Sequence, residues 1–147
     1  MEAFKLQPLR NNNNISRSRY YDEDKRFLDF VREYLAKSHR SDRYKRMYLN
    51  TLDHIEGYCE LNGLNIQTLY TDSLDMEFCE NFVHYLQSDR NLMQNTVKGH
   101  LERMQAMIQK AMLYGYYVNN SYKEVHVPEE EVGAVFLTYW SMGRSTN

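Results

Sequence analysis

The side chains best suited to chemistry in this 147-residue chain are its histidines and cysteines. Four of these seven residues form two pairs, His54 with Cys59 and Cys79 with His84. The members of each pair are five residues apart, which on a helix turns the two side chains about 140° from each other. One metal ion cannot take both ligands of such a pair from one helix face, so we expect no metal site. The cysteines form no Cys-x-x-Cys motif, and we expect them to be buried free thiols.

Acidic residues offer a second kind of candidate chemistry. The segment 51–89 carries eight Asp and Glu and no Lys or Arg, and its candidates are Asp72, Asp75, Glu77 and Glu80. No partner motif frames these carboxylates for acid–base catalysis, so we interpret them as helix caps and solvated helix surface. The chain also lacks a Gly-rich phosphate loop and a Gly-x-Ser-x-Gly motif. We therefore expect no catalytic residue and no cofactor.

Positive charge is segregated along the chain. The net charge is +5 over residues 1–50, −8 over 51–89, +4 over 90–123 and −3 over 124–147, although the whole chain carries only −2. Two basic blocks separated by an acidic one can meet on one face of a folded domain, which is the pattern of a polyanion binder. A chance clustering of surface charges is the alternative.

Basic and polar residues are concentrated near the starts of two expected helices, and helix N-termini favour phosphate through free N–H groups and the helix dipole. Long cations beside them strengthen that preference. The candidate DNA contacts are Arg43, Lys45 and Arg46 in the second expected helix, and Asn95, Thr96, Lys98, Arg103 and Lys110 in the fourth. A solvated face on an ordinary helical bundle would explain the same residues.

Hydrophobic periodicity predicts four helices. They cover about 22–38, 41–62, 75–87 and 95–115. Ser41, Asp75 and Asn95 are expected N-caps, and Gly63 and Gly115 are expected to end the second and fourth helices. The expected apolar stripe of the second helix is Tyr44, Met47, Tyr48, Leu52, Ile55 and Cys59, and that of the fourth is Val97, Leu101, Met104, Ile108 and Ala111.

Composition changes outside these helices. We expect a flexible N-terminal segment over 1–21, a helical domain over 22–127, and a linker with the start of a further domain over 128–147, where Pro128 is followed by three glutamates. No stretch approaches the roughly 20 apolar residues of a membrane span, and the N-terminus lacks the pattern of a signal peptide. A cytoplasmic protein without membrane contact is the resulting expectation.

Several short motifs follow one another in a characteristic order. They are Tyr44–Tyr58, Leu74–Leu86, Asn95-Thr96-Val97, Leu101, Ala111, Gly115-Tyr116, Asn119-Asn120 and Phe136-Leu137-Thr138. Over about residues 22–127, this order resembles the core-binding (SAM-like) domain of phage-type tyrosine recombinases, the integrases of bacterial mobile elements. The sequence departs from the family at Ser121, where the family has a proline.

The resemblance implies an all-α, four-helix SAM-like bundle with a polar N-terminal tail and a C-terminal linker. It further implies a DNA-binding module for DNA integration and recombination that forms half of a clamp around double-stranded DNA. In the family, a catalytic domain with a tyrosine nucleophile follows. Only ten residues remain from Thr138 onward, and Tyr139 lies too close to the linker to be that nucleophile, so we expect no catalytic activity from this chain. Homo-oligomerisation of the full-length protein on DNA stays open.

A function of a different class also remains open. The chain contains 13 tyrosines, and a Tyr-rich surface would suit a helical protein–protein interaction module.

Overall fold

The computed structural model describes residues 15–16 and 25–129. Its helices are α1 (Phe27–Lys37), α2 (Asp42–Leu61), α3 (Met76–Ser88) and α4 (Gln94–Leu113), with short 3₁₀ turns η1 (Ile66–Thr68) and η2 (Asn120–Glu124). Two-residue strands β1 (Ile15–Ser16) and β2 (Val118–Asn119) pair antiparallel. The fold is therefore all-α with four helices, which confirms the expected class.

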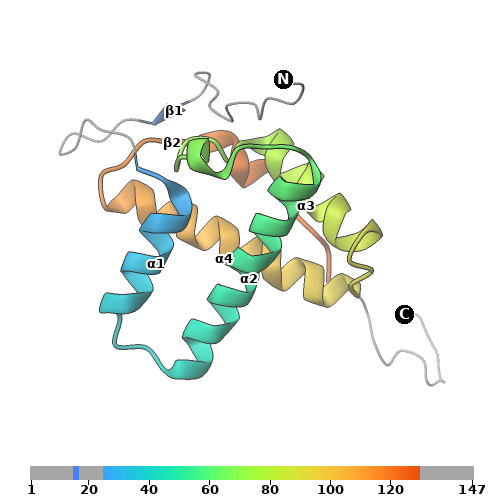
Figure 1. Ribbon diagram of the computed structural model, residues 1–147, viewed down its shortest axis with the longest axis horizontal. Helices are drawn as coiled ribbons and strands as arrows, with labels where there is room; N and C mark the ends of the chain where they lie inside the picture. The colour runs from blue at the N-terminus through green and yellow to red at the C-terminus, as the bar shows by residue number, and fades with distance from the viewer. Residues whose placement is uncertain (1–14, 17–24, 130–147) are drawn as a thin grey trace, which may run out of the picture.

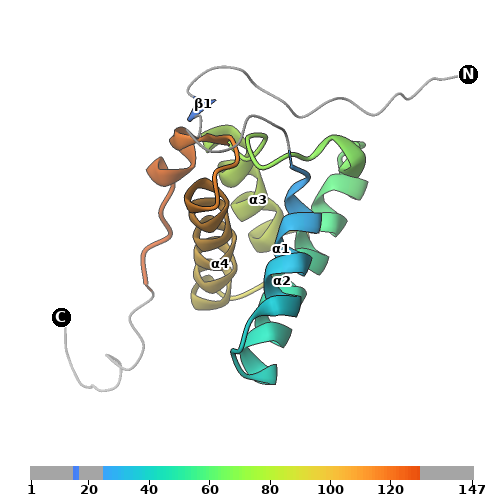
Figure 2. The same cartoon turned by 90° about the vertical axis from the view of Figure 1, so that its left-hand side faces the viewer.

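The helices form two crossed layers. α1 and α2 lie side by side as a hairpin, and α4 crosses behind them (Figures 1 and 2). α3 packs against α4, α2 and η2. The short connection between α1 and α2 is at the bottom of Figure 1, away from the end where β1, η1 and η2 lie. This arrangement leaves the N-terminal half of α2 and one flank of α4 at the surface.

Local capping signals set the start of α2 and of α3. The Ser41 hydroxyl accepts a hydrogen bond from the Tyr44 amide at 3.2 Å, and the Asp75 carboxylate accepts one from the Phe78 amide at 2.9 Å. Both predicted N-caps are confirmed. Each side chain satisfies an amide that the first helical turn leaves without a partner.

The predicted cap at Asn95 is wrong, because the N-cap of α4 is Met93, two residues earlier, and the helix begins at Gln94. The turn before it explains the shift. Asn91 adopts a left-handed conformation with φ 58°, and the Leu92 amide donates to the Leu86 carbonyl at 3.0 Å. The chain reverses direction in this turn directly after α3, so α4 can begin before Asn95 is reached.

The first helix begins later than predicted. Arg26 is extended and α1 starts at Phe27, not near Asp22. The Phe27 amide donates to the Leu69 carbonyl and the Thr71 amide donates to the Lys25 carbonyl, both at 2.8 Å. These long-range hydrogen bonds hold the chain before α1 in a strand-like conformation.

Both predicted glycine stops are confirmed. Gly63 follows α2 with φ 67° and Gly115 follows α4 with φ 101°, values that a residue with a Cβ adopts only at a cost. After α4, the Tyr116 amide donates to the Ala111 carbonyl at 3.0 Å, which closes the helix end.

The core lies between all four helices and is completed by the chain after α4. Val118, Tyr122, Val125 and Val127 are buried there, so the chain after α4 packs against the helices, whereas Pro128 is exposed. All residues of the predicted apolar stripe of α4 are buried. The predicted stripe of α2 is wrong at Met47, which is 41% exposed because it lies one turn before Thr51, where α4 crosses α2. Cys59 and Cys79 are buried free thiols, as predicted. Residues 1–14, 17–24 and 130–147 lie outside the described part, and with them most of the expected tail and linker.

Candidate nucleic-acid interface

One flank of α4 carries three of the predicted contact residues. Thr96, Arg103 and Lys110 are spaced by seven residues, about two helical turns, and so lie one above another. The Lys110 ammonium is 5.7 Å from the ring centroid of Tyr34 in α1, and Arg103 is hydrogen-bonded to Thr51 in α2. This flank of α4 therefore faces the α1–α2 hairpin.

Arg103 is fixed by two side chains at the crossing of α2 and α4. Its Nε donates to Thr51 Oγ1 at 2.9 Å, and its Nη2 lies 3.3 Å from His100 Nδ1. Thr51 Oγ1 is itself 2.8 Å from that imidazole nitrogen. Burial lowers the pKa of Arg103, yet a guanidinium keeps its charge at neutral pH. The side chain thus presents a fixed positive charge at the edge of the crossing.

Tyrosines and cations alternate along the inner side of the hairpin. The Arg40 guanidinium lies 4.1 Å from the ring centroid of Tyr44, and the ring centroids of Tyr44 and Tyr48 are 4.7 Å apart. Burial, with a hydrogen bond to Tyr44, raises the pKa of Tyr48 to about 12, so its hydroxyl stays neutral. Arg40 was not among the predicted contacts, and because it precedes the N-cap Ser41, helical spacing gave no signal for this pairing.

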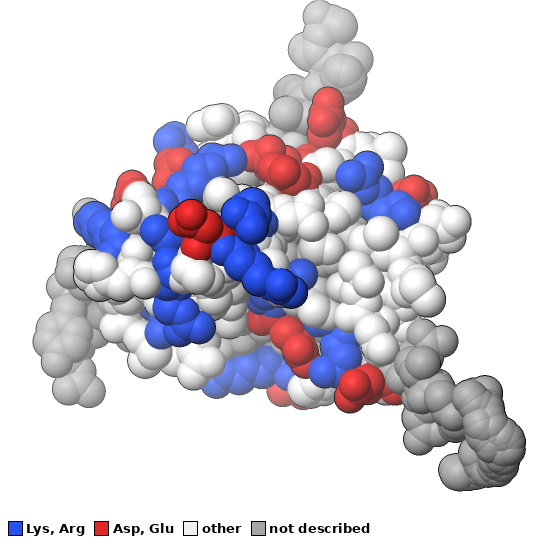
Figure 3. Space-filling view, turned by 90° about the horizontal axis from the view of Figure 1, so that it is seen from below, with Lys and Arg blue, Asp and Glu red and all other residues white. Residues whose placement is uncertain are grey.

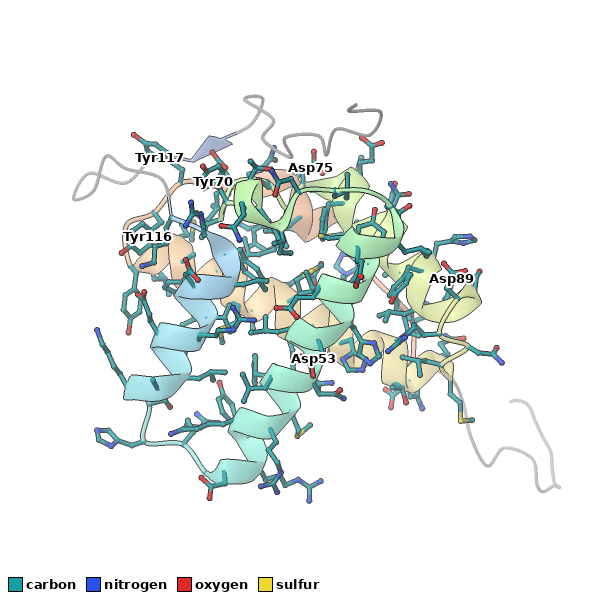
Figure 4. The ribbon with its side chains drawn as sticks, viewed as in Figure 1. Asp53, Tyr70, Asp75, Asp89, Tyr116 and Tyr117 are labelled. Atoms are coloured by element: carbon teal, nitrogen blue, oxygen red, sulfur yellow. The ribbon has the colours of Figure 1, made fainter. Side chains whose placement is uncertain are left out.

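The N-terminal turns of α2 carry two further cations on the outer side of the hairpin. Arg43 and Arg46 are exposed and border a shallow hollow that Asn50 and Asp53 also line. Asp53 lies near the middle of α2 (Figure 4). The two arginines are therefore available to a large ligand approaching the α1–α2 connection.

Two of the predicted contacts lie on other flanks. Lys98 is five residues before Arg103, about 140° around α4, and pairs with Glu102 at 2.6 Å. Lys45 lies on the side of α2 that carries Glu56, the partner of Arg32 in α1. The structure thus separates Lys98 and Lys45 from the flank of Arg103.

Asn95 and Thr96 are both exposed in the first turn of α4. Backbone amides of a first helical turn lack partners within the helix, and they attract anions. The two polar side chains consequently stand where a phosphate would approach this helix end.

Seen from the side of the α1–α2 connection, Lys and Arg side chains gather over one part of the surface, with acidic side chains among them and beside them (Figure 3). We call this surface the basic face. It comprises Arg40, Arg103 and Lys110 along the hairpin and the flank of α4, together with Arg43 and Arg46 from the outer side of α2.

The acidic residues are dispersed. Asp75 and Asp89 lie at the two ends of α3 (Figure 4), and Glu77 and Glu80 are exposed, as the interpretation of caps and helix surface requires. That interpretation is wrong for Asp72, which is 1% exposed in the turn between η1 and α3. Within the described residues, no three His, Cys, Asp or Glu side chains come together as a metal-binding group.

The described residues thus form a small all-α domain with four helices that carries cations and tyrosines on its surface. Residues 26–127 match the model of the Phage integrase SAM-like domain, and the chain belongs to this family. Membership confirms the resemblance and implies DNA binding in an integrase context. The search of curated proteins and that of solved structures each returned no match. None of the described helices has the length and hydropathy needed to cross a bilayer.

Proposed function

We propose that the chain is the core-site DNA-binding domain of a site-specific tyrosine recombinase, and that it clamps duplex DNA through the basic face. The alignment of Arg103 and Lys110 on the flank of α4 that faces the hairpin is the observation that carries the proposal. A second domain would supply the chemistry of strand cutting and rejoining. This chain would supply binding and orientation.

Phosphate contacts follow from the geometry of the basic face. Arg43 and Arg46 extend from the outer side of α2, while Arg103 and Lys110 extend from α4. The two groups of cations would therefore contact two separate sets of DNA phosphates. Arginine suits this task because its planar group offers several N–H donors to one phosphate. We assign Asn95 and Thr96 to closer approach at the groove, and Lys45 and Lys98 to peripheral phosphates.

The dependence of DNA affinity on salt tests the proposal. If five or six cations contact phosphates, log K should fall with log[salt] with a slope of roughly −5, since each neutralised phosphate contributes about −0.9. Arg103→Ala should reduce the slope by about 1. Lys98→Ala, from the other flank of the same helix, is the matched control and should change it less. Absence of binding to any duplex at low salt, or binding that salt leaves unchanged, would contradict the proposal.

One observation favours a second candidate function, a protein–protein interaction module. Tyr114 is 51% exposed and lines a hollow with Phe30, Tyr34 and Tyr116 between the ends of α1 and α4. Aromatic residues of this kind are enriched in protein interfaces. If Tyr114→Ala abolished association with a protein while Arg103→Ala left DNA binding unchanged, this function would replace the first.

A further inference from the structure

We propose that Thr51 and His100 are positioning residues that hold the Arg103 guanidinium in its DNA-binding orientation, with His100 neutral and its proton on Nε2. The inference rests on the proposed function in one respect, that Arg103 contacts DNA. The hydrogen-bond network itself is independent of DNA.

The chemistry of the donors fixes the proton positions. A guanidinium can only donate hydrogen bonds, so Thr51 Oγ1 accepts from Arg103 Nε at 2.9 Å. The imidazole Nδ1 of His100 lies 3.3 Å from Arg103 Nη2, and we assign it as the acceptor because the guanidinium has no acceptor atom of its own. The Thr51 hydroxyl proton then points to that Nδ1 at 2.8 Å or to the Met47 carbonyl at 3.2 Å. An Nδ1 that accepts carries no proton, which places the proton of a neutral imidazole on Nε2.

The two positioning residues, which we call the anchors, are more deeply buried than the guanidinium that they hold. Thr51 and His100 are each 2% exposed, whereas Arg103 is half-buried. Two of the five N–H groups of the guanidinium are used by the anchors, so three remain for a phosphate. The side chain also lies across Gly99, where no Cβ narrows the space beside Nη1. Because the guanidinium is ordered before DNA arrives, binding costs less side-chain entropy.

The surroundings of His100 oppose a second proton. The His54 ring of α2 packs edge-to-face at 4.5 Å, and Nη2 of Arg103 in α4 lies 3.3 Å from the His100 Nδ1. Beyond His54 lie Arg90, which opposes its protonation, and Asp53, which favours it. Burial, then His54 and Arg103, lowers the pKa of His100 to about 4. The network is therefore intact at neutral pH.

Thr51→Val and Thr51→Ser form a matched pair for the test, because valine keeps the shape without the hydroxyl and serine keeps the hydroxyl. Nitrogen-15 NMR of the free protein at pH 7.5 should show His100 Nδ1 unprotonated and slow exchange of the Arg103 Nε proton. Thr51→Val should accelerate that exchange at least tenfold, and Thr51→Ser should keep it slow. Duplex affinity at low salt should fall severalfold in Thr51→Val, recover in Thr51→Ser, and be unaffected by Thr51→Val in an Arg103→Ala background.

A protonated Nδ1 at pH 7.5, or an Nε proton whose exchange Thr51→Val leaves unchanged, would overturn the inference. It would also be overturned if Thr51→Val bound DNA as tightly as the unsubstituted chain, and in that case the proposed function would stand. If the unsubstituted chain bound no duplex, the proposed function would fail and the NMR measurements would still decide the orientation of Arg103. Should Thr51→Val fail to fold, the Nδ1 protonation state of the unsubstituted protein and the Nε exchange in Thr51→Ser decide the question.

Discussion

The helix α2 contacts two partners of opposite character. Towards its C-terminal end, Tyr58 packs against Phe78, Phe82 and Tyr85 of α3, with ring centroids 5.1 to 6.0 Å apart. We call this the aromatic side. One to two turns earlier, α2 meets α4 through polar groups, of which Thr51, His100 and Arg103 are hydrogen-bonded and His54 packs against the His100 ring, and we call this the polar crossing. It comprises Thr51, His54, His100 and Arg103.

We infer from this difference that one end of α2 mainly stabilises the fold, whereas the other mainly positions a group for binding. The buried rings of the aromatic side stabilise the domain, but they do not fix the orientation of any one group, because the hydrophobic effect is non-directional. Hydrogen bonds at the polar crossing stabilise less in net terms, but each sets the direction of a group. The cation that the crossing orients, Arg103, belongs to the basic face. We therefore expect substitutions on the aromatic side to change folding, and substitutions at the crossing to change binding.

Phe82→Ala should give the largest effect. The ring is fully buried between Tyr58 and Tyr85, so truncation leaves a cavity and loses apolar burial. We expect the free energy of unfolding to fall by about 3–5 kcal/mol, measured by urea denaturation. A loss below about 1 kcal/mol would show that the aromatic side does not carry the stability of the domain. Arg103→Ala, measured in parallel, should unfold closer to the unsubstituted protein than to Phe82→Ala.

Acid should act through the polar crossing. His100 has a folded pKa of about 4 against an ordinary value of 6.5, so the unfolded chain takes up its proton first. This group's contribution to stability is complete above pH 6.5 and is lost as the pH falls from 6.5 towards 4. Between pH 6.5 and 5 we expect a loss of up to about 2 kcal/mol. His54, whose pKa burial also lowers, acts in the same direction.

The variant His100→Asn isolates that effect, since asparagine retains a hydrogen-bond acceptor and does not titrate. The difference between the two pH profiles removes the contribution of carboxylates common to both proteins. Identical slopes for the two proteins over pH 5–6.5 would show that His100 titrates as freely in the fold as in the unfolded chain.

Sequence reasoning succeeded where the signal is local. Ser41 and Asp75 cap their helices through an amide three residues away, and Gly63 and Gly115 take the left-handed conformation directly after a helix. It failed at the start of α1, because that boundary depends on hydrogen bonds to the distant loop containing Leu69. Sequence periodicity carries no information about such a pairing.

The sequence predicted which kinds of residue form the candidate site better than it predicted which of them lie together. Sequence identified the cations, and the spacing of seven between Arg103 and Lys110 could have separated them from Lys98. The polar crossing was missed, because Thr51 and His100 lie beside the apolar stripes, and because their contact joins two helices through residues 49 positions apart in the sequence. A polar residue directly next to a stripe residue on each of the two helices, Thr51 before Leu52 and His100 before Leu101, is the signal that would have indicated it.

Gly57 lies beside the aromatic side and Gly99 beside the polar crossing, so replacing each with alanine tests how tightly each region is packed around one added methyl group. Glycine in a helix interior costs about 1 kcal/mol relative to alanine. A Cβ at Gly99 would lie 3.4 Å from Arg103 Nη1, an ordinary contact, so we expect Gly99→Ala to stabilise by up to about 1 kcal/mol. A Cβ at Gly57 would lie 2.6 Å from the Tyr85 hydroxyl, so the buried ring must shift and Gly57→Ala should destabilise by about 1 kcal/mol. Equal thermal shifts for the two variants would contradict the denser packing of the aromatic side.

Thiol labelling should give the smallest effect, because no reaction is expected in the native protein. Cys59 and Cys79 are 1% and 0% exposed, and burial raises the pKa of each thiol to about 12. At pH 8 only about one thiol in ten thousand would then be the reactive thiolate, so labelling must follow opening of the fold. A thiol reagent should modify the unsubstituted protein at the rate set by unfolding, and Phe82→Ala far faster. Rapid labelling of both cysteines in the native protein would mean that the aromatic side opens locally, and would remove the contrast with the polar crossing.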